Sequence, residues 1–399
     1  MNRIELYTER SEAFFKEYKV ADRKFKLVAT LRILAFIALL VIIVFMANQR
    51  SNEGILAAII IAPILFGLII KYHNKISYLR NTLLFKTEIN KEEVLRLQNN
   101  LTSFDSGKEF FDEMHPYLYD MDIVGKHSLF QLLNRTSTRQ GRAQLFSMLS
   151  SPDTVSEIKQ RQEAVMELGK DIDWIQNFQA MGRHVNQSKK YKEELDAWLK
   201  EKGRLWKGKY AGIIAILTSS ALLIFGLGWI FYSIPIGFFL LSLLIAGMVL
   251  KQNAKVAERI YEQTYDGLKE IMVIKNLILA IQNKTFVSEK LLFLQAPFSG
   301  QGVNASHRLA KLSGLLEYFH ARANAFYHVF NLFFFLDIHL IRALETWKSK
   351  NADYVSEWFD KVSEMEAINS LAGFHHGNPS YHFPTIVEEG HFFEATALG

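Results

Sequence analysis

Residues 210–250 read YAGIIAILTSSALLIFGLGWIFYSIPIGFFLLSLLIAGMVL and contain no charged side chain. Two glycines and Pro235 interrupt this run near its middle, which leaves two apolar halves of about the length that crosses a bilayer as a helix. Trp229 and Tyr232 lie close to the interruption, as aromatic side chains do at a membrane–water interface. The stretch therefore predicts two membrane-spanning helices joined by a tight turn.

A shorter apolar pair precedes it near the N-terminus. Residues 31–47, LRILAFIALLVIIVFMA, carry a single charge at Arg32, and residues 54–70, GILAAIIIAPILFGLII, carry none. Each of these runs is at the short end of what spans a bilayer and could, taken alone, be a buried core helix. Four such runs in two pairs favour membrane spans. The sequence thus predicts one transmembrane hairpin over residues 30–72 and a second over residues 209–251.

Basic residues flank both hairpins at their outer ends. By the positive-inside rule, this pattern predicts cytoplasmic N- and C-termini and a four-span protein of the bacterial inner (cytoplasmic) membrane. The cluster before the second hairpin is also a candidate for contacts with anionic lipid or DNA. The residues of that cluster are Lys200, Lys202, Arg204, Lys207 and Lys209. The other flanking cations are Lys16, Lys19, Arg23, Lys24, Lys26, Arg32, Lys71, Lys75, Arg80, Lys251, Lys255 and Arg259.

The amino-acid composition indicates the fold class and excludes several kinds of site. Only seven prolines occur among 399 residues, and long stretches lack both glycine and proline, which favours an all-α chain. The absence of cysteine excludes disulfides, thiolate zinc sites and cysteine nucleophiles. The net charge of +5 suits anionic lipid headgroups or nucleic acid and does not choose between them.

The polar segments read as helices from the spacing of their apolar residues. Residues 1–29 predict an amphipathic helix, residues 73–117 a connecting helix, and residues 254–284 one long amphipathic helix. The segment KKYKEELDAWLKEKGRLW carries a similar stripe before the second hairpin, so two long helices are expected to lead into and out of the membrane and to pack as a stalk. Residues 330–338, FNLFFFLDI, are too short to span and contain Asp337, which favours a core helix there.

A polar segment between the hairpins reads LFQLLNRTSTRQGRAQLFSMLSSPDTVSEIKQRQEAVMEL over residues 129–168. Thr136 or Ser137 is predicted to cap a helix that begins near Arg139, and Pro152 separates that helix from the next one. The Arg-Gln pair of the second helix carries enough hydrogen-bond donors to hold neighbouring helix ends or loop carbonyls. These residues therefore read as parts of a scaffold.

This polar segment resembles the core domain of the MutS family of DNA mismatch repair ATPases. A second stretch, VSEMEAINSLAGFHHGNPSYHFPTI at residues 362–386, resembles the helix by which that family's chain returns to the core, and FFEATALG at residues 392–399 resembles the approach to its ATPase domain. The two stretches occur in the family's order. The core-motif residues that carry the first match are Leu129, Leu132, Thr136, Thr138, Gly141, Pro152, Arg161 and Gln162.

The resemblance implies a division of the chain into core, lever and anchor parts. Residues 118–208 would form the MutS-core-like domain and an ascending lever helix, residues 252–354 a descending lever helix and core helices, and residues 355–399 the return helix and the lead-in to a missing ATPase domain. A transmembrane hairpin would replace the family's DNA clamp. For the full-length protein the family implies bound ATP and Mg²⁺ and a homodimer, and DNA binding stays open.

No catalytic or cofactor-binding motif is recognised within this sequence. It lacks a Gly-x-x-x-x-Gly-Lys-Ser/Thr phosphate loop, so ATPase activity is expected only from the missing domain. His375, His376 and His382 lie in GFHHGNPSYHFP, which reads as a turn without a metal site because no carboxylate or cysteine accompanies them. The alternative to a MutS-like protein is a non-enzymatic inner-membrane structural or partner-binding protein with helical cytoplasmic stalks.

Overall fold

The structure, a computed structural model, describes most of the chain as helices joined by short connections, and the described residues contain no strand. The all-α prediction is therefore confirmed for this part of the chain. The chain divides into two compact units, which are described separately below. The first unit comprises Met1–Thr136, Leu145–His184 and Ile368–Gly399, and the second comprises Ser137–Gln144 and Val185–Ala367. The described residues are 2–49, 52–184, 197–201, 210–265, 267–300, 304–387 and 393–395, with only the backbone described for 52, 53, 55–60, 62–64, 325 and 326.

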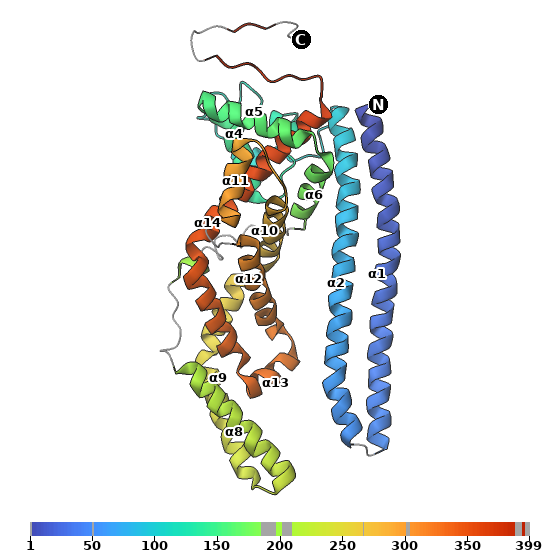
Figure 1. Cartoon of the computed structure of the whole chain (residues 1–399), viewed down its shortest axis with the longest axis vertical. Helices are drawn as coiled ribbons and strands as arrows, with labels where there is room; N and C mark the ends of the chain where they lie inside the picture. The colour runs from blue at the N-terminus through green and yellow to red at the C-terminus, as the bar shows by residue number, and fades with distance from the viewer. Residues whose placement is uncertain are drawn as a thin grey trace. The chain divides into compact units, whose positions relative to one another are not determined.

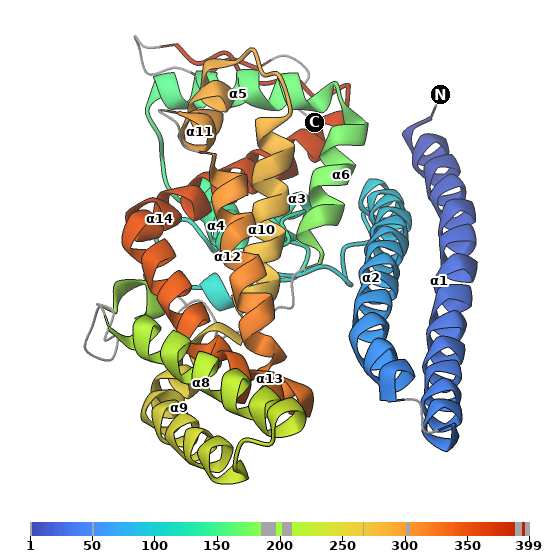
Figure 2. The ribbon, with the colours of Figure 1, turned by 60° about the horizontal axis from the view of Figure 1, so that its bottom comes forward.

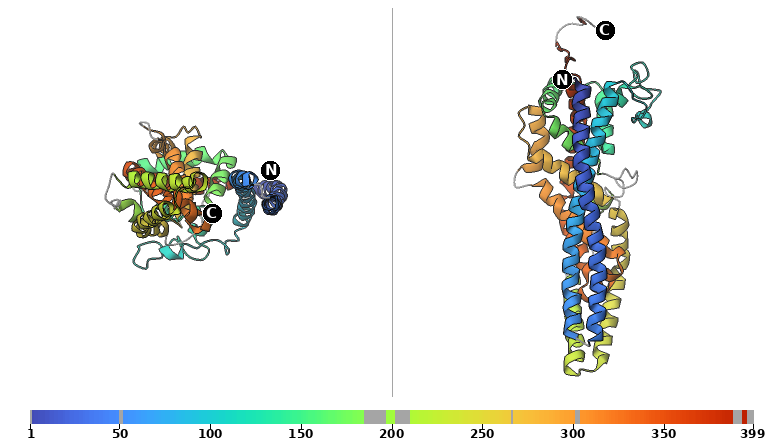
Figure 3. Two further views of the ribbon diagram at one scale, coloured as in Figure 1. Left: turned by 90° about the horizontal axis from the view of Figure 1, so that it is seen from below. Right: turned by 90° about the vertical axis from the view of Figure 1, so that its right-hand side faces the viewer.

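A long helical hairpin begins the first unit. Helices α1 (Arg3–Asn48) and α2 (Asn52–Leu97) lie side by side in both views that show them lengthwise (Figure 1, Figure 3). The Asn2 side chain accepts a hydrogen bond from the backbone of Ile4, and Glu5 completes the capping box that starts α1. The predicted surface helix and the first apolar run are thus one continuous helix. Of the connecting helix predicted over residues 73–117, residues 73–97 form the second half of α2, whereas residues 98–117 contain no α-helix, so the prediction is wrong for that part.

The two ends of α1 differ in their surroundings. Tyr7, Ala21 and Val28 are buried, whereas the apolar side chains beyond them are exposed, including Leu34 at 55% and Val44 at 60%. A helix of this length with an apolar, exposed second half has the character of a membrane segment, because water would disfavour such a surface.

The rest of the first unit packs against the near end of this hairpin. Gln176 of α6 exchanges hydrogen bonds with Asn90 of α2 at 2.9 and 3.1 Å and accepts two from Arg10 of α1 at 2.9 and 3.2 Å. Asn90 and Gln176 are buried and satisfy each other's amide groups, so these contacts hold α6 against both long helices. The other elements are η1 (Lys108–Phe110), α3 (Leu129–Leu133), the second half of α4 (Arg139–Ser150), α5 (Val155–Gly169) and α6 (Ile172–Gly182), with the end of α14.

The second unit contains a shorter apolar hairpin. Helices α8 (Ala211–Tyr232) and α9 (Ile236–Tyr265) turn back at Ser233, whose φ of 55° is left-handed, and Pro235 follows in the turn (Figure 1). The predicted interruption is therefore confirmed at Pro235, whereas Gly226 and Gly228 lie within α8 and do not break the helix. The remaining elements are α10 (Gly267–Gln282), α11 (Glu289–Ser299), α12 (Ala305–His320), η2 (Ala321–Ala323), α13 (Ala325–Phe334) and α14 (Leu336–Gly377).

Helices α10, α12 and α14 surround the core of this unit (Figure 2). Of the predicted helix over residues 254–284, residues 254–265 belong to α9 and residues 267–282 to α10, and residue 266 lies outside the described residues. Of the predicted helix that leads into the hairpin, only residues 197–201 are described.

The segment 330–338, predicted as a core helix, contributes Phe335 and Ile338 to the core, but it is divided between two helices, α13 and α14. The chain turns a corner between α13 and α14 at Phe335, which has a φ of 50° and is fully buried. Phe335 and Ile338 pack into one apolar cluster with Ala215 and Leu222 of α8 and with side chains of α9. Burial of the phenyl ring against this hairpin compensates for a backbone conformation that costs a non-glycine residue roughly 1–3 kcal/mol.

Three described helices, α1, α8 and α9, are long and apolar enough to cross a membrane by length and composition. The fourth predicted span, residues 54–70, lies within α2, but most side chains of its first half are outside the described residues. The structure thus bears on three of the four predicted spans.

Candidate functional site

The core motif is organised in the second unit by a buried carboxylate from α14. Glu366 is 4% exposed and accepts hydrogen bonds from the backbone nitrogens of Ser137 and Thr138, at 2.9 and 3.2 Å, and from the Thr138 hydroxyl. The Thr138 hydroxyl in turn accepts from the Gly141 nitrogen at 2.9 Å and so caps α4. The predicted cap, Thr136 or Ser137, is thus wrong by one or two positions.

Burial raises the pKa of Glu366, and its three hydrogen bonds oppose that change only in part. The carboxyl group also explains Gly141. A Cβ atom at this position would lie 2.5 Å from Glu366 Oε2 and 3.0 Å from its Cβ, so that a larger residue would displace the carboxyl group from its donors. The pair Glu366 and Gly141 therefore joins two segments that are far apart in the sequence.

We expect Gly141→Ala to lower the free energy of unfolding by about 1–3 kcal/mol, because overpacking outweighs the gain in helix propensity. Gly314→Ala is the matched control, since a Cβ there meets nothing within 4 Å in α12, and it should be neutral or stabilising. Chemical denaturation of the full chain in detergent measures both values. Equal effects at the two glycines would contradict the role of Glu366.

A second buried network holds the same motif in the first unit. The Arg135 guanidinium donates to both carboxylate oxygens of Glu93 at 2.7 Å, and the Arg135 backbone nitrogen donates to the Ser370 hydroxyl at 2.6 Å. Burial alone would raise the pKa of Glu93, but Arg135 and Arg96 outweigh it and hold that pKa below its usual value. Burial also lowers the pKa of Arg96, to about 10. Arg135 and Glu93 form a desolvated, bidentate ion pair that fixes α2 against the motif.

The other motif residues make contacts within the first unit. Arg161 pairs with Asp153, and Gln162 donates to the Pro384 carbonyl oxygen at 3.1 Å, as its donor capacity suggests. Thr136 donates from its hydroxyl and its backbone nitrogen to the Asn134 side chain. Pro152 is exposed between α4 and α5, and Leu132 is half-buried. Leu129 lines an apolar cavity of about 280 Å³ together with Leu133, Val165, Leu371, Phe374, His375, Tyr381, His382 and Phe383.

The predicted cluster of cations before the second hairpin is mostly outside the described residues. Lys200 is exposed on the described segment 197–201. Lys202, Arg204, Lys207 and Lys209 lie outside the described part of the chain.

The histidines near the C-terminal end of α14 are placed differently from the prediction. His375 and His376 belong to the last turn of α14, because that helix continues to Gly377. His376 contacts the Gly169 carbonyl oxygen at 2.8 Å and the Arg3 guanidinium at 3.2 Å. The described residues include no group of His, Cys, Asp and Glu side chains that could hold a metal ion.

A further histidine, His184, makes the folding stability of the first unit depend on pH. The His184 ring stacks on Tyr78 with centroids 4.1 Å apart and contacts the Thr82 hydroxyl at 2.9 Å, and its burial lowers the pKa to about 4. A folded pKa below the unfolded value of about 6.5 gives a stability contribution that is complete above pH 6.5 and is lost as the pH falls towards 4. We expect His184→Phe to flatten the fall of the melting temperature across this window, whereas exposed His382→Phe should leave it unchanged.

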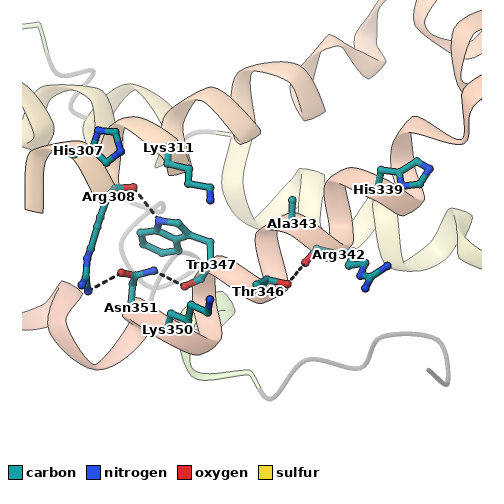
Figure 4. Close-up of a pocket in the computed structure, with 10 residues that line it drawn as sticks. All are labelled: His307, Arg308, Lys311, His339, Arg342, Ala343, Thr346, Trp347, Lys350 and Asn351. Carbon is teal, nitrogen blue, oxygen red and sulfur yellow. Dashed lines mark hydrogen bonds between the residues drawn. The ribbon is translucent and has the colours of Figure 1, made fainter. Parts of the chain in front are cut away.

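The accessible site of the second unit is a cavity of about 560 Å³ between α12 and α14, which we call the basic pocket (Figure 4). Its framework is a chain of hydrogen bonds. The Trp347 indole donates to the Arg308 carbonyl oxygen at 2.8 Å, the Arg308 guanidinium donates to the Asn351 side-chain oxygen at 3.1 Å, and the Asn351 amide donates to the Trp347 carbonyl oxygen at 2.6 Å. The lining residues are His307, Arg308, Lys311, His339, Arg342, Ala343, Thr346, Trp347, Lys350 and Asn351.

The charge of the basic pocket has one sign. No aspartate or glutamate lines it, and within the described residues no ion pair joins Lys311, Arg342 or Lys350 to a carboxylate. All three side chains are exposed, while Trp347 and Asn351 are buried beneath them. Cations that converge on a cavity without acidic partners create a positive potential suited to an anion. Sequence reasoning missed this pocket, although Arg342, Thr346 and Lys350 recur at four-residue spacing.

The described chain is thus an all-helical protein with three helices of membrane-spanning length, a scaffold motif organised by buried carboxylates, and one exposed basic pocket. Comparisons with protein-family models, with curated proteins and with solved structures find no match to this chain.

Proposed function

We propose that this chain is a membrane-anchored protein built on the core and lever plan of the MutS family, with transmembrane hairpins where that family carries DNA-reading and clamp domains. One observation carries the proposal. The two separate stretches that resemble the family's core are joined through Glu366, which binds Thr138 and leaves room only for glycine at position 141. A core that holds one fixed conformation is expected to contain such contacts, in which small and hydroxyl residues pack against a buried carboxylate.

The membrane part of the proposal comprises four spans with both termini in the cytoplasm of a bacterium. The exposed apolar surfaces of α1, α8 and α9 support it, as does the charge-free sequence of residues 54–70. Lys and Arg residues at the outer ends of both hairpins favour a cytoplasmic location for those ends.

Helix α14 supplies a mechanical connection in the second unit. It begins at the corner that packs on α8 and α9 and runs without interruption to Glu366 and beyond. At a rise of about 1.5 Å per residue, Ile338 of the apolar cluster and Glu366 of the motif are roughly 40 Å apart along one helix. A change in the core would therefore act on the hairpin through one continuous helix.

ATP, Mg²⁺ and dimerisation enter the proposal only through the family resemblance. The sequence has no phosphate loop, so its residues do not fit ATP in the way that the family binds it, and no step is assigned to nucleotide.

The test begins with the coding sequence beyond the codon for Gly399. The proposal predicts a Gly-x-x-x-x-Gly-Lys-Ser/Thr motif within roughly the next hundred codons and Mg²⁺-dependent ATP hydrolysis by the complete product in detergent. A stop codon, or a complete product without hydrolysis, would favour the alternative of a non-enzymatic membrane protein that binds a partner through its helical cytoplasmic part. Adding mismatched and perfect DNA duplexes to the same assay then decides whether DNA stimulates hydrolysis.

A further inference from the structure

We propose that the basic pocket between α12 and α14 binds the phosphate group of an anionic phospholipid. This inference rests on the proposed membrane anchoring, but it concerns a site that the core and lever plan does not require. The argument combines the charge of the pocket, its position relative to α8 and its size.

The charge of the pocket suits a phosphate. The Arg342 guanidinium can bind two phosphate oxygens at once, and Lys311 and Lys350 add ammonium groups that can approach from other directions. Lys311 of α12 and Lys350 of α14 lie on either side of Trp347 in the close-up view (Figure 4). A bound phosphate would offset part of the positive charge that Lys311, Arg342 and Lys350 bring to the pocket.

The position of the pocket favours lipid as the source of that phosphate. The Arg342 guanidinium lies over the first turn of α8, since a Cβ atom at Gly212 would be 2.7 Å from its Nη1. Exposed apolar side chains of α8 begin one residue later, with Ile213 at 50% and Ile216 at 57% exposure. Arg342 therefore lies at the level where an apolar, membrane-facing surface gives way to a polar one, which is where lipid phosphates are found.

The contacts at the start of α14 also place the basic pocket at the end of the apolar hairpin. Ser219 of α8 donates to the Phe333 carbonyl oxygen at 2.6 Å, so the corner before α14 packs alongside the apolar part of α8. From Asp337 to Arg342 the helix rises by roughly 8 Å, which takes α14 from the depth of the apolar hairpin to its end. The basic pocket opens along this rising segment, as a site for a headgroup should.

The size of the pocket also fits. Its volume of about 560 Å³ lies within the range of roughly 300–1,000 Å³ that is typical of small-molecule sites and can hold a phosphate with its glycerol. The hydrogen-bonded framework of Trp347, Arg308 and Asn351 is complete without a ligand, so the walls are already formed. Binding would therefore require little loss of conformational freedom in these side chains.

The test titrates the full chain in detergent with short-chain phosphatidylglycerol, phosphatidylcholine, inorganic phosphate and a DNA duplex, and reads the rise in melting temperature as an apparent affinity. Phosphatidylglycerol is expected to bind about tenfold or more tightly than the other three. Arg342→Gln and Lys311→Gln should each weaken its binding by roughly tenfold, since each removes a charge-assisted hydrogen bond. Lys255→Gln, an exposed cation just beyond the apolar part of α9, is the matched control and should change it by less than about twofold.

Each of the following outcomes would overturn the inference. If both variants bind phosphatidylglycerol as tightly as the parent chain does, the basic pocket does not bind this lipid. Equal affinity for inorganic phosphate would make the pocket a phosphate site without lipid, and DNA binding that the same two variants weaken would assign it to nucleic acid. Alkaline carbonate washing of native membranes distinguishes the two proposals. A chain that washes off refutes both, whereas a chain that stays without a lipid effect refutes the pocket alone.

Discussion

Replacing Arg135 with methionine is expected to lower the free energy of unfolding by about 3–5 kcal/mol, the largest effect of a single substitution in the first unit. Arg135 and Glu93 are 2% and 6% exposed at their side chains, and both guanidinium-to-carboxylate distances are 2.7 Å. Without Arg135, Glu93 stays buried beside Arg96 alone, whose nearest nitrogen is 3.3 Å away. Chemical denaturation in detergent measures the loss.

Two controls separate this ion pair from a general loss of charge. Arg161→Met breaks a more exposed pair with Asp153 and should cost less than about 1 kcal/mol. The double variant Arg135→Met with Glu93→Leu should recover part of the loss, because it removes the uncompensated carboxylate. Strict additivity of the two single effects would contradict a coupled buried pair.

Replacing Asp337 with leucine is expected to lower the free energy of unfolding by a similar amount, about 3–5 kcal/mol. Asp337 is 5% exposed and accepts hydrogen bonds from the Tyr327 hydroxyl at 2.7 Å and the Asn331 amide at 3.0 Å, and Arg322 Nε lies 3.1 Å away. Its removal leaves these donors without an acceptor beside the apolar hairpin. The unfolding transition in detergent should therefore shift strongly.

Asp337→Asn is the matched variant, because an amide oxygen still accepts from Tyr327 while the charge is lost. It should cost roughly half as much as Asp337→Leu, since hydrogen bonds to charged groups are the stronger ones. A leucine variant as stable as the parent would show that the corner between α13 and α14 does not depend on Asp337.

The second hairpin could be predicted from the sequence because its signal is local. A charge-free run with Pro235 near its middle has few alternatives to two apolar helices and a turn, and the described turn includes Ser233 and Pro235. The corner at Phe335 could not be predicted in this way. No glycine or proline marks it, and its cause is the burial of Phe335 among residues that are distant in the sequence.

The core motif illustrates the same difference. Three consecutive hydroxyl residues, Thr136, Ser137 and Thr138, are equally good caps by local chemistry, so the sequence predicted the wrong position. Glu366 makes the choice, because it holds the backbone of Ser137 and the hydroxyl of Thr138. A pattern of neighbouring residues cannot predict a contact with a buried carboxylate that is distant in the sequence.

The basic pocket could not be predicted from the sequence, because it forms only where two helices pack against each other. Arg342, Thr346 and Lys350 recur every four residues and so share one face of α14, but cations on such a face usually lie on a solvated surface. That this face meets Arg308 and Lys311 of α12 around a cavity follows from the pairing of two helices whose sequences are independent.

The most direct test of the membrane-anchored account uses the absence of natural cysteine. Tyr232→Cys at the tip of the second hairpin and Tyr318→Cys on α12 are exposed at 81% and 71% in the parent chain, so a membrane-impermeant maleimide can reach both. In intact cells whose outer membrane is permeabilised, the account predicts that the cysteine at position 232 is labelled and that the cysteine at position 318 is labelled only after the inner membrane is broken. Labelling of both positions from the same side would contradict a hairpin that crosses the membrane.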